Sequence, residues 1–174
     1  MSEIAKTNKE QKVVKNKKRW LVYALVGILF GIFDFYFQQI DFGASSLARV
    51  LAIFGIWLVP LVPIALYEAR ISRSILKPAL ASIFTWSIAI IAYYLYLLVG
   101  LVFIGQASRP EMHISSTSDP YYWENLQSAF LGDIGGGIVE WIGLAIVGGG
   151  ILGSLIGFAY KVITRLRHTE KPSN

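Results

Sequence analysis

Four long runs of apolar residues dominate this sequence and restrict what the chain can fold into. They cover residues 20–40, 46–67, 79–105 and 134–160. About 20 mostly apolar residues are enough for a helix to cross the hydrocarbon core of a bilayer, and a crossing segment has to satisfy its own backbone hydrogen bonds. The sequence therefore predicts an all-α integral membrane protein, folded as a bundle of four transmembrane helices.

Lysine and arginine are concentrated in three of the segments outside these runs. Seven lie in residues 1–19, three lie between the second and third runs, and four lie in residues 161–174. The remaining two are Arg49, at the start of the second run, and Arg109, in the connection between the third and fourth runs. Because cytoplasmic segments are enriched in basic residues, we expect both termini to lie in the cytoplasm, as in a multi-pass protein of the cell membrane. Residues 106–133 then form a long loop on the outer side.

The chain is accordingly divided into a basic N-terminal arm (1–19), a membrane domain (20–160) and a basic tail (161–174). The high charge and low hydrophobicity of the arm predict that it lacks regular structure until it nears the membrane. Anionic lipid head groups on the cytoplasmic face would attract both basic ends. Within the outer loop, residues 121–132 fit either a short interfacial helix or an irregular loop.

The second run contains Pro60 and Pro63, and the segment after it is charged. Because proline has no amide hydrogen and crowds the preceding turn, we expect a kink near Pro60. Glu68, with Arg70 and Arg73, closes the run. The simpler interpretation of this charged end is a solvated segment that fixes orientation, and the alternative is a docking site for a partner.

Two acids, Asp34 and Glu140, lie inside the predicted spans. Charges are costly within a bilayer, so such residues are candidates for function. Each acid shares a helical stripe with glycines and other polar residues, since spacings of three and four return to the same face. The first helix carries Gly27, Gly31, Asp34, Gln38 and Asp41 on its stripe, and the fourth carries Asp133, Gly136, Gly137, Glu140, Gly143 and Gly150.

The two acids are expected at matching depths. Asp34 precedes Asp41 by seven residues and Glu140 follows Asp133 by seven, which places both roughly 10 Å below the outer surface. If the first and fourth helices are neighbours, the four carboxylates would line one outward-facing vestibule suited to protons or cations. The structural alternative is a static ion pair with Arg49, which begins the second helix on the same side.

A further series of small residues, Gly149, Gly153 and Gly157, recurs every four residues on another face of the fourth helix. Small residues at this spacing allow helix backbones to approach closely. Together with Gly27 and Gly31, these glycines are predicted to be helix-packing positions.

The composition excludes several classes of chemistry. The chain has no cysteine, and both histidines, His113 and His168, lie outside the apolar runs, which excludes disulfides, thiolate metal sites and bis-histidine haem within the membrane. No nucleotide-binding, metalloprotease or serine-hydrolase pattern occurs, so we expect no enzyme, no cofactor and no metal centre. The net charge of +5 lies beside the apolar runs, which favours a lipid surface over nucleic acid as a partner.

Two functional hypotheses follow from these features. The first is a small transporter or channel-like protein that uses its intramembrane acids for proton- or cation-linked transport, as a homo-oligomer because four helices enclose little space. The second is a non-catalytic accessory or assembly subunit of a larger membrane complex, which would dock through its glycine faces and basic tails.

Overall fold

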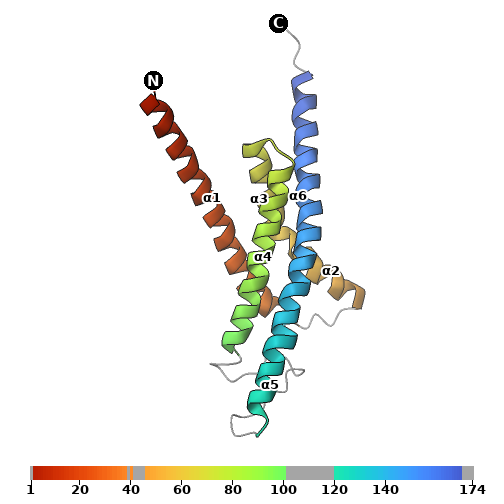
Figure 1. The fold of residues 1–174 in the computed structure, drawn as a ribbon. Coiled ribbons are helices and arrows are strands. Elements are labelled where there is room, and N and C mark those ends of the chain that lie inside the picture. The colour runs from red at the N-terminus through yellow and green to blue at the C-terminus, as the bar shows by residue number, and fades with distance from the viewer. Residues whose placement is uncertain (1, 39, 41–45, 101–119, 170–174) are drawn as a thin grey trace.

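The computed structural model describes residues 2–38, 40, 46–100 and 120–169 of the chain (Figure 1). These residues are 94% helical and contain no strand. The helices in chain order are α1 (Ser2–Phe37), α2 (Ser46–Ile56), α3 (Leu58–Ser72), α4 (Leu76–Val99), α5 (Tyr122–Ser128), the π-helix η2 (Ala129–Gly136) and α6 (Gly137–Thr169).

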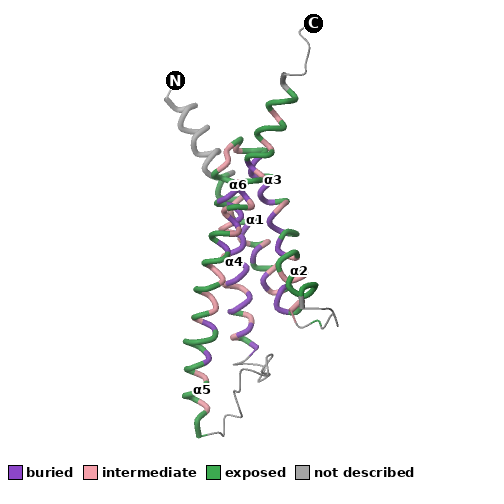
Figure 2. The backbone as a smooth tube through the Cα atoms, turned by 90° about the vertical axis from the view of Figure 1, so that its right-hand side faces the viewer, coloured by how far each residue is buried: buried purple, intermediate pink, exposed green. Residues whose placement is uncertain are grey.

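Four stretches of these helices are long and apolar enough to cross a membrane. They are Asn16–Phe37, Leu47–Ser72, Leu76–Val99 and Tyr122–Arg167. Exposed residues occur along all four stretches (Figure 2). Many of these residues have large aliphatic or aromatic side chains, which is typical of helix faces in contact with lipid. The prediction of an all-α chain with four helices of membrane-spanning length is confirmed.

Helix α4 organises the bundle, because it packs against α1, α3 and α6. Its side chains Trp86, Ile90, Tyr93 and Leu97 form much of the main hydrophobic core. Three points lie at the same end of the molecule: the start of α1, the junction of α3 with α4, and the end of α6 (Figure 1). This arrangement is the one expected for an even number of crossings.

Glycines bring α1 into backbone contact with α4. A Cβ added at Gly27 would lie 2.7 Å from the carbonyl oxygen of Thr85, which is too close for a side chain. Gly31 lies in the same way against the carbonyl of Ala89. The two glycines are four residues apart, so they form one contact face along α1.

Helix α6 contacts α4 through a second set of glycines. A Cβ added at Gly153 would lie 2.5 Å from the carbonyl oxygen of Pro78, and one added at Gly149 would lie 3.0 Å from the backbone nitrogen of Ile83. Gly157 lies against the backbone one turn further on. The face that carries these three glycines is therefore the face of α6 that packs into the bundle.

Replacing Gly153 by alanine should lower the free energy of unfolding by roughly 1–3 kcal/mol, the usual effect of added volume in a packed interior. Gly55 provides the control, because a Cβ there would meet no atom within 4 Å and alanine is the better helix former. Gly55→Ala should be neutral or slightly stabilising. Thermal unfolding of both variants in detergent measures the difference, and equal unfolding midpoints would contradict the packing of α6 against α4.

The second span is interrupted at Trp57, which separates α2 from α3. Because Pro60 has no amide hydrogen, the carbonyl of Ile56 lacks the donor that a regular helix would supply one turn later. The following bond is long, with 3.4 Å between the nitrogen of Leu61 and the carbonyl oxygen of Trp57. This interruption agrees with the kink expected near Pro60, and α2 leans outward relative to α3 in Figure 1.

Two segments outside the predicted spans are helical, one against the expectation and one in line with the helical alternative for residues 121–132. Helix α1 continues back to Ser2, so the prediction that residues 1–19 lack regular structure was wrong. The arm contains no glycine or proline and is rich in lysine, which is a good helix former. In the predicted outer loop, residues 106–119 lie outside the described residues, and residues 122–133 are helical, in α5 and η2.

Candidate functional site

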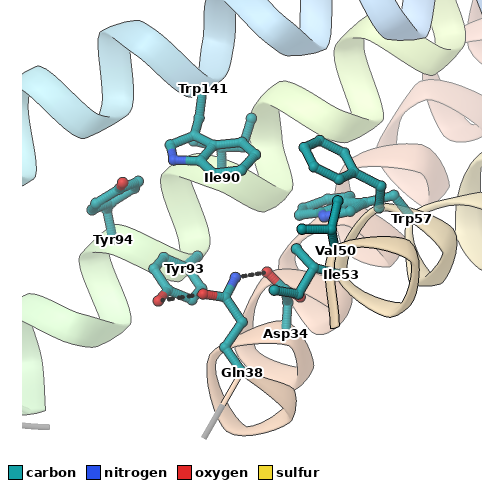
Figure 3. Close-up of a pocket in the computed structure, with 10 residues that line it drawn as sticks. Asp34, Gln38, Val50, Ile53, Trp57, Ile90, Tyr93, Tyr94 and Trp141 are labelled. Atoms are coloured by element: carbon teal, nitrogen blue, oxygen red, sulfur yellow. Dashed lines mark hydrogen bonds between the residues drawn. The ribbon is translucent and has the colours of Figure 1, made fainter. Parts of the chain in front are cut away.

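A cavity of about 260 Å³ lies near the end of α1, between α1, α2, α4 and α6 (Figure 3). Trp57, at which the second span is interrupted, lines this cavity. Among the described residues that line the cavity, Asp34 is the one acid. The lining consists of Asp34, Gln38, Val50, Ile53, Phe54, Trp57, Ile90, Tyr93, Tyr94 and Trp141.

Three polar side chains are linked in sequence at one side of this cavity. The amide nitrogen of Gln38 donates to Oδ2 of Asp34 at 2.8 Å, and the hydroxyl of Tyr93 donates to Oε1 of Gln38 at 3.3 Å (Figure 3). Gln38 follows Asp34 by one helical turn, so both side chains extend from the same face of α1. The amide therefore connects the carboxylate on α1 to a phenol on α4.

Aromatic rings form much of the remaining wall. The rings of Tyr93 and Tyr94 meet edge to face, with centroids 5.2 Å apart. Trp57 and Trp141 line the cavity from the second and fourth spans (Figure 3). Aromatic faces carry a partial negative charge that attracts cations. A cavity with one buried carboxylate at its side and several rings in its wall is thus suited to a bound cation with an apolar body.

Asp34 lies closer to the end of its helix than the sequence suggested. It precedes Phe37, the last residue of α1, by three residues, which corresponds to about 5 Å along the helix axis. The expected depth of roughly 10 Å rested on a helix that continues to Asp41. Asp41 lies outside the described residues.

Glu140 does not reach the cavity, so the predicted vestibule of paired carboxylates was wrong. Its neighbour Trp141 lines the cavity, which means that α6 passes Asp34 at the expected level. Consecutive residues of an α-helix point about 100° apart, and the side chain of Glu140 is exposed on the surface. Asp133, in η2, is exposed as well.

Arg49 also lies apart from Asp34, although Val50 beside it lines the cavity. Its side chain is exposed near the start of α2. Within the described part of the chain, the ion pair that forms joins Arg19 to Glu68 instead. The alternative of a static ion pair between Arg49 and Asp34, Asp133 or Glu140 is therefore not found there.

A second buried polar cluster, which the sequence did not reveal, joins α1 to α3. Glu68 is 0% exposed, and its Oε2 lies 3.0 Å from Nε of Arg19 and accepts a hydrogen bond of 2.8 Å from the hydroxyl of Tyr23. The interpretation of Glu68 as part of a solvated helix end was wrong. One feature of the sequence could have indicated this cluster. Arg19 and Tyr23 continue the four-residue spacing of Gly27 and Gly31, so they lie on the face of α1 that packs into the bundle.

The fold defines the class of this protein, since its four long apolar helices indicate a membrane protein. No family of known proteins matches the sequence, and no curated protein and no solved structure matches it either. The function has to be inferred from the chemistry of the cavity.

Proposed function

We propose that this protein binds a small organic cation in the cavity at Asp34, in exchange for a proton, and carries the cation across the membrane. The observation that supports this most strongly is a carboxylate that is 1% exposed and borders a cavity of about 260 Å³ walled by aromatic rings. In surroundings of low polarity, a carboxyl group is stable either with a proton or beside a positive charge.

The groups around the cavity favour an organic cation over a metal ion. Hard metal ions bind six or more oxygen ligands or keep much of their water. Here one carboxylate and one amide are accompanied mainly by apolar and aromatic side chains. Among the described residues, no three acids, histidines or cysteines come together as a metal site. A weakly hydrated cation can instead lose its water and contact the rings.

Proton and cation compete because both need the carboxylate of Asp34. When two ligands exclude each other, each lowers the affinity for the other by the same factor. A proton gradient would then move the cation in the opposite direction. Gln38 is hydrogen-bonded to both Asp34 and Tyr93. A change in the charge of Asp34 would therefore alter the hydrogen bond that Gln38 makes with Tyr93 on α4.

Binding of tetraethylammonium tests this function, because Trp57 and Trp141 line the cavity and tryptophan fluorescence reports on its contents. The emission of the purified protein should change saturably, and acidification should raise the half-saturating concentration. A neutral alcohol of similar size should bind at least about tenfold more weakly, since it lacks the charge. No saturable change, or an equal response to the alcohol, would contradict the proposal.

We also propose that both termini lie in the cytoplasm of a cell-membrane protein, where the basic ends meet anionic lipid. The support is that basic segments flank the end of the molecule where α1 begins, α3 meets α4 and α6 ends (Figure 1). Because the chain has no cysteine, single cysteines at Ser2, Ser116 and Ser173 can be treated with an impermeant thiol reagent on intact cells. Only Ser116→Cys should react, and labelling at either terminus would overturn this orientation.

A second candidate function is an accessory or assembly subunit. The observation that favours it is the outer surface of α6, where Glu140 is exposed and a Cβ added at Gly143 would meet no atom of the described residues within 4 Å. Affinity purification from native membranes, followed by mass determination of the complex, distinguishes this function from independent transport.

A further inference from the structure

We infer that two copies of this chain pair through the outer face of α6, with Glu140 of one copy beside Arg49 of the other. The inference rests on α6 and α2 and does not depend on which ligand occupies the cavity. The small size of the bundle suggests a homo-oligomer, and this inference identifies the surface through which its copies would meet.

Helix α6 carries glycines on two faces, and among the described residues only one of these faces is packed against another helix. Gly149 and Gly153 lie against the backbone of α4, whereas a Cβ added at Gly143, or at Gly136 at the end of η2, would meet no atom within 4 Å among the described residues. Gly136, Glu140 and Gly143 follow each other at spacings of four and three, so they share the uncovered face. This face would allow the backbone of another helix to approach closely.

Glu140 forms no ion pair with the described residues of its own chain. Its side chain is exposed among apolar side chains that are also exposed, including Val139, Leu144 and Val147. Because a carboxylate facing lipid is costly, a contact that supplies a cation at this level would be strongly favoured.

Arg49 is the complementary charge. It is exposed on α2 and adjoins Val50, which lines the same cavity as Trp141, the neighbour of Glu140. The two charges therefore lie at similar levels along the bundle. In a pair of parallel copies related by a twofold axis along the bundle, each Arg49 can meet the partner's Glu140, so two equivalent ion pairs form at once.

Single cysteines test where the copies meet, because the chain has no cysteine of its own. Val147 lies on the proposed face and Leu29 lies on α1, and both side chains are 61% exposed, so they are matched in accessibility. In proteoliposomes that contain only the purified protein, diluted in lipid, oxidation should link Val147→Cys into a dimer at least about tenfold faster than Leu29→Cys, because a fixed contact raises the effective concentration.

Charge reversal tests the ion pair itself. In the Val147→Cys background, Glu140→Arg and Arg49→Glu should each slow linking by at least about tenfold, because like charges then meet. The double reversal should restore the original rate, which also shows that the single variants did not merely misfold. Equal linking at Val147 and Leu29 would overturn the pairing, as would single reversals that link normally or a double reversal that fails to recover. A linked product from native membranes with a mass other than twice that of the chain would assign this face to a different protein and would also overturn it.

Discussion

Replacing Asp34 by asparagine should weaken the binding of tetraethylammonium by at least about 100-fold, because the bound cation would lose its counter-charge in a site lined mainly by apolar and aromatic side chains. The side chain keeps nearly the same size, so the shape of the cavity should be preserved. Affinity also depends on pH in the wild type, where it should fall as the pH falls and protons occupy the carboxylate. In Asp34→Asn the remaining weak binding should not change with pH.

Glu140→Gln is the matched control for this variant. It removes a carboxylate at the same level of the bundle, but from the exposed surface of α6 rather than from the cavity. Its affinity for the cation should change by less than about threefold, since the side chain of Glu140 does not line the cavity and so would not contact the bound cation. Titration by tryptophan fluorescence over a range of pH measures both variants. If they behave alike, the carboxylate of Asp34 is not the site of binding.

Replacing Glu68 by alanine should lower the free energy of unfolding by about 3 kcal/mol, the lower end of the range for breaking a buried ion pair. Arg19 would keep a charge beside an emptied interior site, and the hydroxyl of Tyr23 would lose its acceptor. The lower end applies because the side chain of Arg19 is 15% exposed and can reach water. Glu68→Gln should be less damaging, because an amide oxygen still accepts the hydrogen bond from Tyr23.

Arg70→Ala is the control for Glu68, because Arg70 lies two residues further along α3 and is exposed. Its effect on stability should stay within about 0.5 kcal/mol, as for most surface substitutions. Unfolding in detergent, followed by circular dichroism, compares the two variants. Similar unfolding curves for Glu68→Ala and Arg70→Ala would mean that the buried cluster does not hold α1 to α3.

The helical spans could be predicted from the sequence because they depend on local properties. Run length and hydropathy are enough to identify a spanning helix, and Pro60 is enough to predict an interruption nearby. The ends of the helices were harder to predict, as the extension of α1 to Ser2 shows. A charged segment without glycine or proline can be helical or irregular, and composition does not decide between these states.

The cavity could be predicted only in part, because it depends on which helices are neighbours. Helical spacing brought Asp34 and Gln38 to one side of α1. It could not show that Tyr93 and Trp141 would face them from α4 and α6. The error over Glu140 has a similar origin, since α6 has two faces that carry glycine. The sequence alone does not show which face is packed and which is exposed.

Glu68 shows the same limitation in a second place, the contact between α3 and the middle of α1. Its neighbours in the sequence include Arg70 and Arg73, which made a solvated segment the simpler interpretation. Its partners in the fold, Arg19 and Tyr23, are far away in the sequence and belong to another helix. A buried charge is recognised by its partners, and those partners become visible only when α1 and α3 are placed together.

The most direct test of proton-linked cation transport at Asp34 is the uptake of labelled tetraethylammonium into proteoliposomes with an acidic interior. Protons leaving through the wild-type protein should drive cation accumulation, and collapsing the pH gradient should stop it. Asp34→Asn should show no accumulation, while Glu140→Gln should retain it. Accumulation that does not depend on the pH gradient, or that persists in Asp34→Asn, would contradict the exchange of a proton for a cation at Asp34.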